Sequence, residues 1–198
     1  MTTRAQKIIL QQVKYLLAAT YSSPTPERRD TLITWIRELL DPLVKNKVPE
    51  AMYLSTRLPY EEDGSIVFSS CRDTMLDTII YAAKGGCKEA QYQYACQLYE
   101  QGNSSDAIRL YKKSADKGFA PAQWCYGIDK LYGIGCRKSV PEGIKYIQSA
   151  AAQKNTFAMD FLIRAYRDGA YGFSKNLPEA KKLARISKES MFESEDLI

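Results

Sequence analysis

The 198-residue sequence predicts an all-α protein, a right-handed solenoid built from paired antiparallel helices. The first observation is a repeat: the stretch Ala82-Ala-Lys-Gly-Gly-Cys-Lys-Glu-Ala-Gln91 recurs at residues 114–123 and more loosely at 150–159, with offsets of 32 and 36 residues. Such offsets are typical of stacked helix pairs, each of which buries its apolar face against its neighbours. The second observation is that the segments before and after the recurring stretch, such as 107–115 and 122–131, carry apolar residues at helical spacing. The recurring stretch is therefore a tight turn between two helices.

Residues 1–47 predict two N-terminal capping helices. The first, over residues 4–20, has one apolar stripe, and the sequence Thr25-Pro26 supplies an N-cap and a first helical proline for the second. The second, over 31–47, has an apolar face that must be covered on more than one side: Leu32, Ile33, Trp35, Ile36, Leu39, Leu40, Leu43 and Val44. The first segment is also basic and lacks acids before Glu27, as a mitochondrial presequence does. Its apolar stripe favours a helix that covers the first repeat, and both interpretations remain open.

Residues 48–188 predict about four helix pairs, and residues 189–198 an acidic tail. The first pair is degenerate, because an insertion at 59–70 brings an acidic, glycine-containing turn and a short apolar run. Such an insertion can serve a partner or be a tolerated loop. In that pair, Met75, Leu76, Ile79 and Ile80 are expected to face inward. The tail holds four acids and no bases, which predicts that it is disordered or folded back on a basic surface.

The repeat motif resembles that of the Sel-one-like repeat family, a relative of the tetratricopeptide solenoids. The residues that carry the resemblance are clearest in the second full unit: Ala122-Gln123, Gly127, Gly133-Ile-Gly135, Pro141-Glu-Gly143 and Ala150-Ala151. The resemblance covers roughly residues 50–188, and the repeat sequence is most similar in pattern to that of fungal members such as chitin synthase activators. The resemblance implies tetratricopeptide-like helix pairs and a non-enzymatic adaptor or scaffold that binds other proteins.

The residue types give little support to catalysis or metal binding. The chain has no histidine, and its five cysteines form no Cys-x-x-Cys pair. No nucleophile stands beside a base in a recognisable motif, so we expect no catalytic residues, no metal and no cofactor. An odd number of cysteines without a signal peptide favours reduced thiols and a cytoplasmic location. No segment is apolar for long enough to span a bilayer.

Positive charge is concentrated in the C-terminal half. The net charge is +5, and residues 101–188 contain 16 Lys or Arg against 7 Asp or Glu. A surface of this kind attracts RNA, acidic lipid or an acidic protein segment equally well. No RNA-binding signature accompanies it, so an RNA-facing or ribosome-associated factor is the alternative function, and outward lysines that serve solubility are the simpler explanation.

The family resemblance also implies a partner-binding surface. In such solenoids the first helix of each pair lines the concave side, and aromatic and arginine side chains are the usual anchors of interfaces. The positions that this rule selects suit a protein or peptide with an acidic segment: Tyr53, Arg57, Tyr92, Cys96, Tyr99, Trp124, Ile128, Tyr132, Asp160, Arg164 and Arg167.

Overall fold

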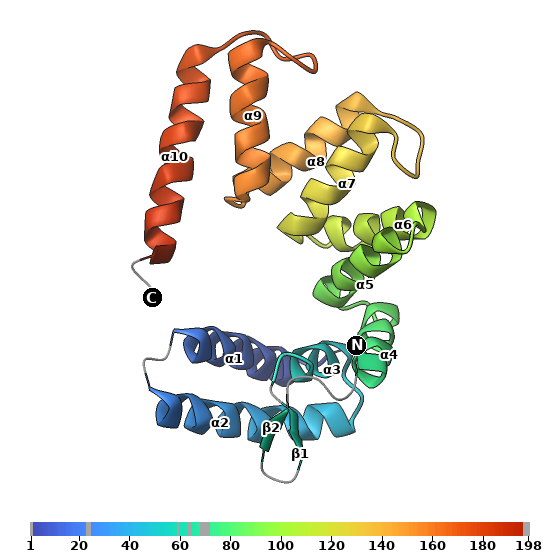
Figure 1. The fold of residues 1–198 in the computed structure, drawn as a ribbon, viewed down its shortest axis with the longest axis vertical. Helices are drawn as coiled ribbons and strands as arrows, with labels where there is room; N and C mark the ends of the chain where they lie inside the picture. Colours follow the sequence, from blue (N-terminus) through green and yellow to red (C-terminus); the bar gives the residue numbers. More distant parts are fainter. Residues whose placement is uncertain (1, 23–24, 59, 63–64, 68–71, 196–198) are drawn as a thin grey trace. The chain divides into compact units, whose positions relative to one another are not determined.

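The computed structural model describes residues 2–22, 25–58, 60–62, 65–67 and 72–195, and within them the chain is helical apart from one small hairpin (Figure 1). The elements in order are α1 (Arg4–Tyr21), α2 (Pro26–Lys45), α3 (Pro49–Ser55), β1 (Tyr60–Glu62), β2 (Ser65–Val67), α4 (Arg72–Lys84), α5 (Lys88–Glu100), α6 (Ser104–Asp116), α7 (Ala120–Tyr132), α8 (Val140–Ala152), α9 (Thr156–Asp168) and α10 (Leu177–Glu195). The contacts divide them into two compact units, Met1–Gln91 and Tyr92–Ile198, which we call unit 1 and unit 2.

Unit 1 begins with the hairpin of α1 and α2. The Thr3 hydroxyl accepts a bond from the Gln6 amide while the Gln6 side chain accepts from the Thr3 amide, and this capping box starts α1. Thr25 caps α2, with Pro26 as the first helical residue. The helix α1 packs on α2 and α3, and the capping role of residues 1–47 stays a prediction.

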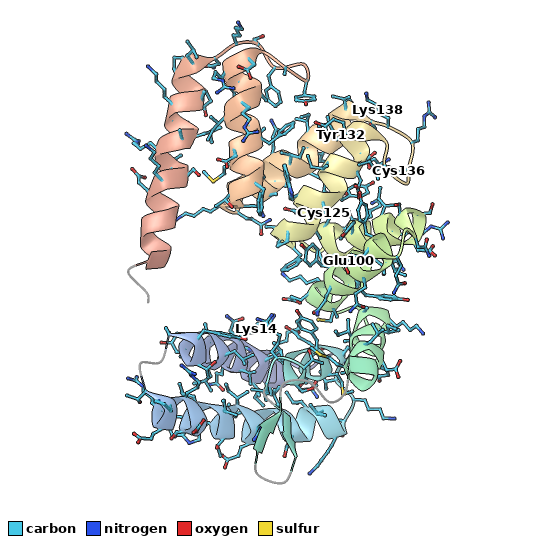
Figure 2. All side chains as sticks on the ribbon, in the orientation of Figure 1. Lys14, Glu100, Cys125, Tyr132, Cys136 and Lys138 are labelled. Atoms are coloured by element: carbon cyan, nitrogen blue, oxygen red, sulfur yellow. The ribbon has the colours of Figure 1, made fainter. Side chains whose placement is uncertain are left out.

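A charged contact fastens α1 to the rest of unit 1. The Lys14 ammonium lies 2.6 Å from a Glu50 carboxylate oxygen on α3 and 3.0 Å from one of Glu89 at the start of α5, and Figure 2 labels Lys14 on α1. Burial alone would lower the pKa of Lys14, but the hydrogen bonds to Glu50 and Glu89 outweigh it, and the pKa is raised. Burial alone would raise the pKa of Glu89, but hydrogen bonds from its own backbone and from Lys14 lower it. Both groups are therefore held in their charged forms.

The predicted insertion at 59–70 contains the hairpin. Strands β1 and β2 pair antiparallel, with Tyr60 opposite Val67, and residues 59, 63–64 and 68–70, including part of the expected turn, lie outside the described residues. In α4, Ile79 is buried as expected, whereas Met75 is exposed. The prediction for Met75 is wrong because α3 has only 7 residues against the 13 of α4, so the first turn of α4 extends past the helix that it packs against.

The recurring Ala-Gln pair has a structural role in the turns between helix pairs. The Gln91 side-chain amide donates to the Ala83 carbonyl at 3.1 Å, and Gln123 donates to the Ala115 carbonyl at 3.2 Å. Each bond is the second that its carbonyl accepts, because the turn amides of Gly86 and Gly118 already donate to Ala83 and Ala115 at 3.1 and 2.9 Å, and it ties the start of the next helix to the end of the preceding one. The repeat spacing of the sequence thus reflects a repeated backbone contact.

In unit 2, consecutive helices pack as antiparallel neighbours, α7 against α8 and α9 against α10 (Figure 1). The crossing of α7 and α8 is close, because a Cβ placed on Gly143 would stand 2.6 Å from the Gly127 carbonyl oxygen. The helices α7 and α9 both end at a left-handed glycine, Gly133 with φ +82° and Gly169 with φ +73°. Helix α10 continues to Glu195, so residues 189–195 of the predicted acidic tail are helical rather than disordered, and 196–198 lie outside the described residues.

Candidate functional site

The predicted binding positions separate into buried and exposed groups. Tyr53 is 7% exposed in the core of unit 1, and burial raises its pKa. Arg57 donates to the Tyr21 hydroxyl at 3.4 Å. Tyr53 therefore belongs to the core rather than to a contact surface, since the position rule counts helical spacing and not the packing of the short α3.

On α5, the predicted positions are mostly packing residues. The Tyr92 ring lies 5.8 Å from the Tyr111 ring and 5.4 Å from the Phe119 ring, and its side chain is half-buried. Cys96 accepts a hydrogen bond from the Tyr111 hydroxyl at 3.4 Å. The Tyr99 side chain is exposed. In this helix, only Tyr99 of the predicted set is available at the surface.

An exposed aromatic surface is formed by α7, α9 and the loop after α9. The Trp124 ring stacks on the Phe157 ring at 6.2 Å and meets the Phe161 ring edge-on at 6.1 Å. Phe161 in turn lies 5.0 Å from Tyr171, which contacts the Tyr132 ring at 6.4 Å. We call these five residues, Trp124, Tyr132, Phe157, Phe161 and Tyr171, the aromatic face. Phe157 is 66% exposed, and Tyr132 and Tyr171 are also exposed, whereas Trp124 and Phe161 are half-buried against the cluster around Leu131 and Leu162. The face is therefore accessible at Phe157, Tyr132 and Tyr171, and Trp124 and Phe161 connect these rings to the core.

The loop end of the aromatic face is held in an unusual conformation. Tyr171 has φ +56°, which a residue with a side chain rarely adopts. Its hydroxyl lies 2.9 Å from that of Tyr132, the last residue of α7, labelled in Figure 2. This hydrogen bond, with burial as a smaller cause, raises the pKa of Tyr132. The contacts with Tyr132 and Phe161 therefore hold Tyr171 in a conformation that its backbone does not favour.

Charged side chains of α9 border the aromatic face. Asp160, Arg164 and Arg167 are all exposed. Arg167 donates two bonds to the neighbouring Asp168, at 2.8 and 3.1 Å. Arg164 makes no hydrogen bond or ion pair with any residue in the described part of the chain. One guanidinium beside the face is therefore open to an acidic partner group, whereas the other already has a carboxylate.

Ile128, the remaining predicted residue, is half-buried against the cluster around Leu131 and Leu162.

Sequence reasoning missed Phe157, Phe161 and Tyr171. The two phenylalanines share a helical stripe with Arg164, and this spacing could have found them. Tyr171 had no such signal because it lies in a loop and joins the face through tertiary contacts.

Away from this face, several basic residues of unit 2 have acidic neighbours. Lys112 pairs with Asp116 at 2.8 Å, and Lys130 pairs with Glu142 at 2.9 Å. Glu142 also accepts from the Tyr126 hydroxyl at 2.7 Å, and these bonds from Tyr126 and Lys130 lower the pKa of Glu142. These ion pairs engage two of the lysines between α6, α7 and α8 and leave the excess of positive charge as it is.

Asp129 of α7 is a buried acid in unit 2. It is 5% exposed, and burial raises the pKa of its carboxyl to about 7. A raised pKa is common at functional sites, but the carboxyl lies in the packed interior of the repeat. Among the residues that the structure describes, no three His, Cys, Asp or Glu side chains are grouped closely enough to hold a metal ion.

Comparison with known proteins assigns the fold. The sequence matches no protein family and no curated protein. The structure is similar to a Sel1 repeat protein from Oxalobacter formigenes, with a TM-score of 0.68, 21% identity, and coverage of 92% of this chain and 73% of the other. It is also similar to a protective antigen of uropathogenic Escherichia coli strains that displays an SLR fold, with a TM-score of 0.59, 19% identity, and coverage of 78% and 33%.

These similarities define the chain as a protein with the Sel1-repeat fold and confirm the predicted all-α solenoid of helix pairs. Both structures are bacterial, so the expected similarity to fungal members stays a prediction. Of the helices in the described ranges, none combines the length and apolarity that crossing a membrane requires.

Proposed function

We propose that this protein is a non-enzymatic adaptor that binds a peptide segment of a partner protein on the aromatic face. The observation that supports this best is the run of ring contacts from Phe157 through Trp124 and Phe161 to Tyr171, which leaves large apolar side chains exposed. Monomeric proteins rarely expose such patches without a partner. Aromatic residues on a rigid helical scaffold also lose little conformational entropy on binding.

The charged residues of α9 beside the aromatic face indicate which side chains the bound peptide contains. Arg164 has no ion pair or hydrogen bond among the described residues, and only its charge acts on the Asp168 carboxylate, so an acidic side chain of the partner would meet a guanidinium whose donors are unused. The rings would receive apolar or aromatic side chains on either side of that acid. The predicted partner is therefore a segment that mixes acidic and aromatic or aliphatic residues, in extended or helical form.

A second candidate function is RNA binding, as in an RNA-facing or ribosome-associated factor. Exposed aromatic rings next to arginine also suit unpaired bases, which stack on such rings. The ion pairs of Lys112 and Lys130 weigh against this candidate because they engage two lysines that would otherwise be available to contact phosphates. The resemblance to fungal members leaves a chitin synthase complex as one candidate assembly, and we propose a cytoplasmic location in which the four described cysteines stay reduced.

The test is site-specific photo-crosslinking in native extract, with the crosslinking residue at Phe157 and, as a matched control, at exposed Lys113 of α6. We expect one protein partner to be trapped from position 157, to be absent from position 113, and to survive nuclease treatment. The Arg164→Glu variant should weaken the crosslink at unchanged melting temperature, because Arg164 is exposed and unpaired among the described residues. Equal crosslinking from both positions contradicts the proposal, and loss of the product with nuclease favours RNA.

A further inference from the structure

A hollow of about 440 Å³ lies beside the aromatic face, between α8 and the loop that follows α9. Its lining includes Val140, Ile144, Lys145 and Gln148 of α8 and Tyr171 and Phe173 of the loop. Tyr171 also belongs to the aromatic face, where its ring lies 5.0 Å from the Phe161 ring. The hollow and the aromatic face therefore meet at one side chain.

The loop that forms one wall of the hollow is held in place by contacts inside unit 2. The Phe173 ring meets the Tyr166 ring edge-on at 4.8 Å, and the Phe173 amide donates to the Ala170 carbonyl at 3.0 Å. After the loop, the Asn176 amide donates to the Tyr166 carbonyl at 2.8 Å. Because this wall is already formed, a ligand of the hollow loses less free energy to the ordering of the loop.

The hollow and the aromatic face are supported by the same core. The residues that pack against the cluster around Leu131 and Leu162 include Val140, Ile144 and Phe173 from the hollow and Trp124 and Phe161 from the aromatic face. Both surfaces are therefore outer parts of one apolar layer, and they are joined at Tyr171. An apolar side chain that enters the hollow removes its own surface and part of this layer from water.

The charges around the hollow favour an acidic ligand. Among the described residues that line it, Lys145 is the only charged one, and it is exposed. The segments that frame the hollow, 133–148 and 170–176, contain one acid, Glu142, and the cations Arg137, Lys138, Lys145 and Lys175. Glu142 is already bonded by Lys130 and by the Tyr126 hydroxyl. The ammonium groups of Lys145 and of Lys138, labelled in Figure 2, have no hydrogen bond or ion pair in the described ranges.

Helix α9, on the other side of Tyr171, is balanced in charge. Its acids are Asp160 and Asp168, and its bases are Arg164 and Arg167. The excess of positive charge near the aromatic face therefore lies on the side of the hollow. The aliphatic side chains of α8 also distinguish between ligands, because a nucleic-acid base gains most from stacking on rings, whereas Val140 and Ile144 offer contacts suited to an apolar side chain.

We propose that the hollow binds a second apolar side chain of the same peptide, an aliphatic or aromatic residue next to an Asp or Glu that pairs with Lys145. This inference rests on the proposed function of the aromatic face and adds the chemistry of its ligand. The peptide crosses Tyr171, with one apolar anchor on the aromatic face and the other in the hollow. Its acidic residue lies beside the second anchor.

The test begins with a random peptide library displayed on phage and selected on the purified full chain. We expect the selected peptides to be enriched in acidic residues next to aliphatic or aromatic ones. The tightest-binding peptide is then synthesised with a fluorescent label, and its dissociation constant is measured by fluorescence anisotropy.

Variants on both surfaces show whether one peptide occupies both. Gln148→Trp fills the hollow from an exposed position, and Lys145→Glu reverses its charge. Each should raise the dissociation constant about tenfold, and Phe157→Ala should also raise it, because the same peptide contacts the aromatic face. Lys113→Trp and Lys113→Glu, at an exposed position of α6, are the matched controls and should leave it unchanged. All variants should melt at the wild-type temperature.

Charge exchange identifies the acid that meets Lys145. A peptide in which this acid is replaced by lysine should bind the Lys145→Glu variant better than it binds the wild type, because the pair is restored with opposite polarity. If no single replacement in the peptide has this effect, the pairing with Lys145 is wrong.

The outcomes separate this inference from the proposed function. A peptide that Phe157→Ala weakens, but that Gln148→Trp and Lys145→Glu leave unaffected, overturns the second anchor and leaves the proposed function standing. A library that yields no peptide, or only peptides that Phe157→Ala does not weaken, overturns both. If Gln148→Trp instead abolishes binding of poly(U) or a dimer of the purified chain, the hollow belongs to RNA or to a second copy, and the inference is overturned.

Discussion

Replacing Gly143 with alanine tests the close crossing of α7 and α8. A Cβ at this position would lie 2.6 Å from the Gly127 carbonyl oxygen and 2.9 Å from the Leu131 backbone nitrogen. Both contacts are to backbone atoms of the neighbouring helix, which cannot rotate away as a side chain can. The two helices must therefore separate before the methyl group fits.

The expected cost follows from two opposed effects. Inserting a methyl group into a packed contact typically destabilises by about 1–3 kcal/mol. Alanine favours a helix over glycine by at most about 1 kcal/mol, and by less in the first turn, where Gly143 lies. We expect a net loss of roughly 1–2 kcal/mol in the free energy of unfolding, or about 2–8 °C in melting temperature for a chain of this size.

Thermal unfolding followed by circular dichroism measures this loss, with Lys145→Ala as a control on the exposed side of the same helix. The control should change stability by less than about 0.5 kcal/mol. If Gly143→Ala melts at or above the wild-type temperature, helix propensity dominates, and the contact with Gly127 is not as close as described.

Three further changes test other parts of the structure. The buried Asp129 carboxyl has a pKa of about 7 instead of 3.8, so the folded protein holds a proton that the unfolded chain releases above about pH 4. The free energy of unfolding of the wild type should then fall as the pH rises from 4 to 8, by at most about 4 kcal/mol, and Asp129→Asn should remove this pH dependence. If the melting temperatures of the two proteins change with pH in parallel, the raised pKa of Asp129 is refuted. Gly118 has φ +78° with open space around its Cβ position, so Gly118→Val should cost about 1–2 kcal/mol through backbone strain alone, and unchanged melting would mean that the turn adapts. Lys14→Gln leaves Glu50 and Glu89 without their shared cation, and we expect a loss of about 1 kcal/mol in urea unfolding that shrinks in high salt; a loss independent of salt would contradict the electrostatic origin.

The sequence by itself determined the repeat and the ends of many elements, because these depend on local chemistry. The recurring Ala-Gln pair marked the turns in which Gln91 and Gln123 bond the preceding helix. Thr25-Pro26 marked the start of α2, and the glycine of the 114–123 stretch marked a left-handed position. Hydrogen bonding and backbone sterics within a few residues decide each of these features.

Only the tertiary structure decided which side of each helix is covered. Tyr53 and Trp35 both lie on amphipathic helices, yet Tyr53 is buried and Trp35 is exposed, because exposure depends on the elements that pack beside the helix. The aromatic face likewise needs Tyr171 of the loop to meet Phe161 and Tyr132. Helical periodicity places a side chain on a sector of its own helix but does not record the neighbours, and the neighbours separate core from binding surface.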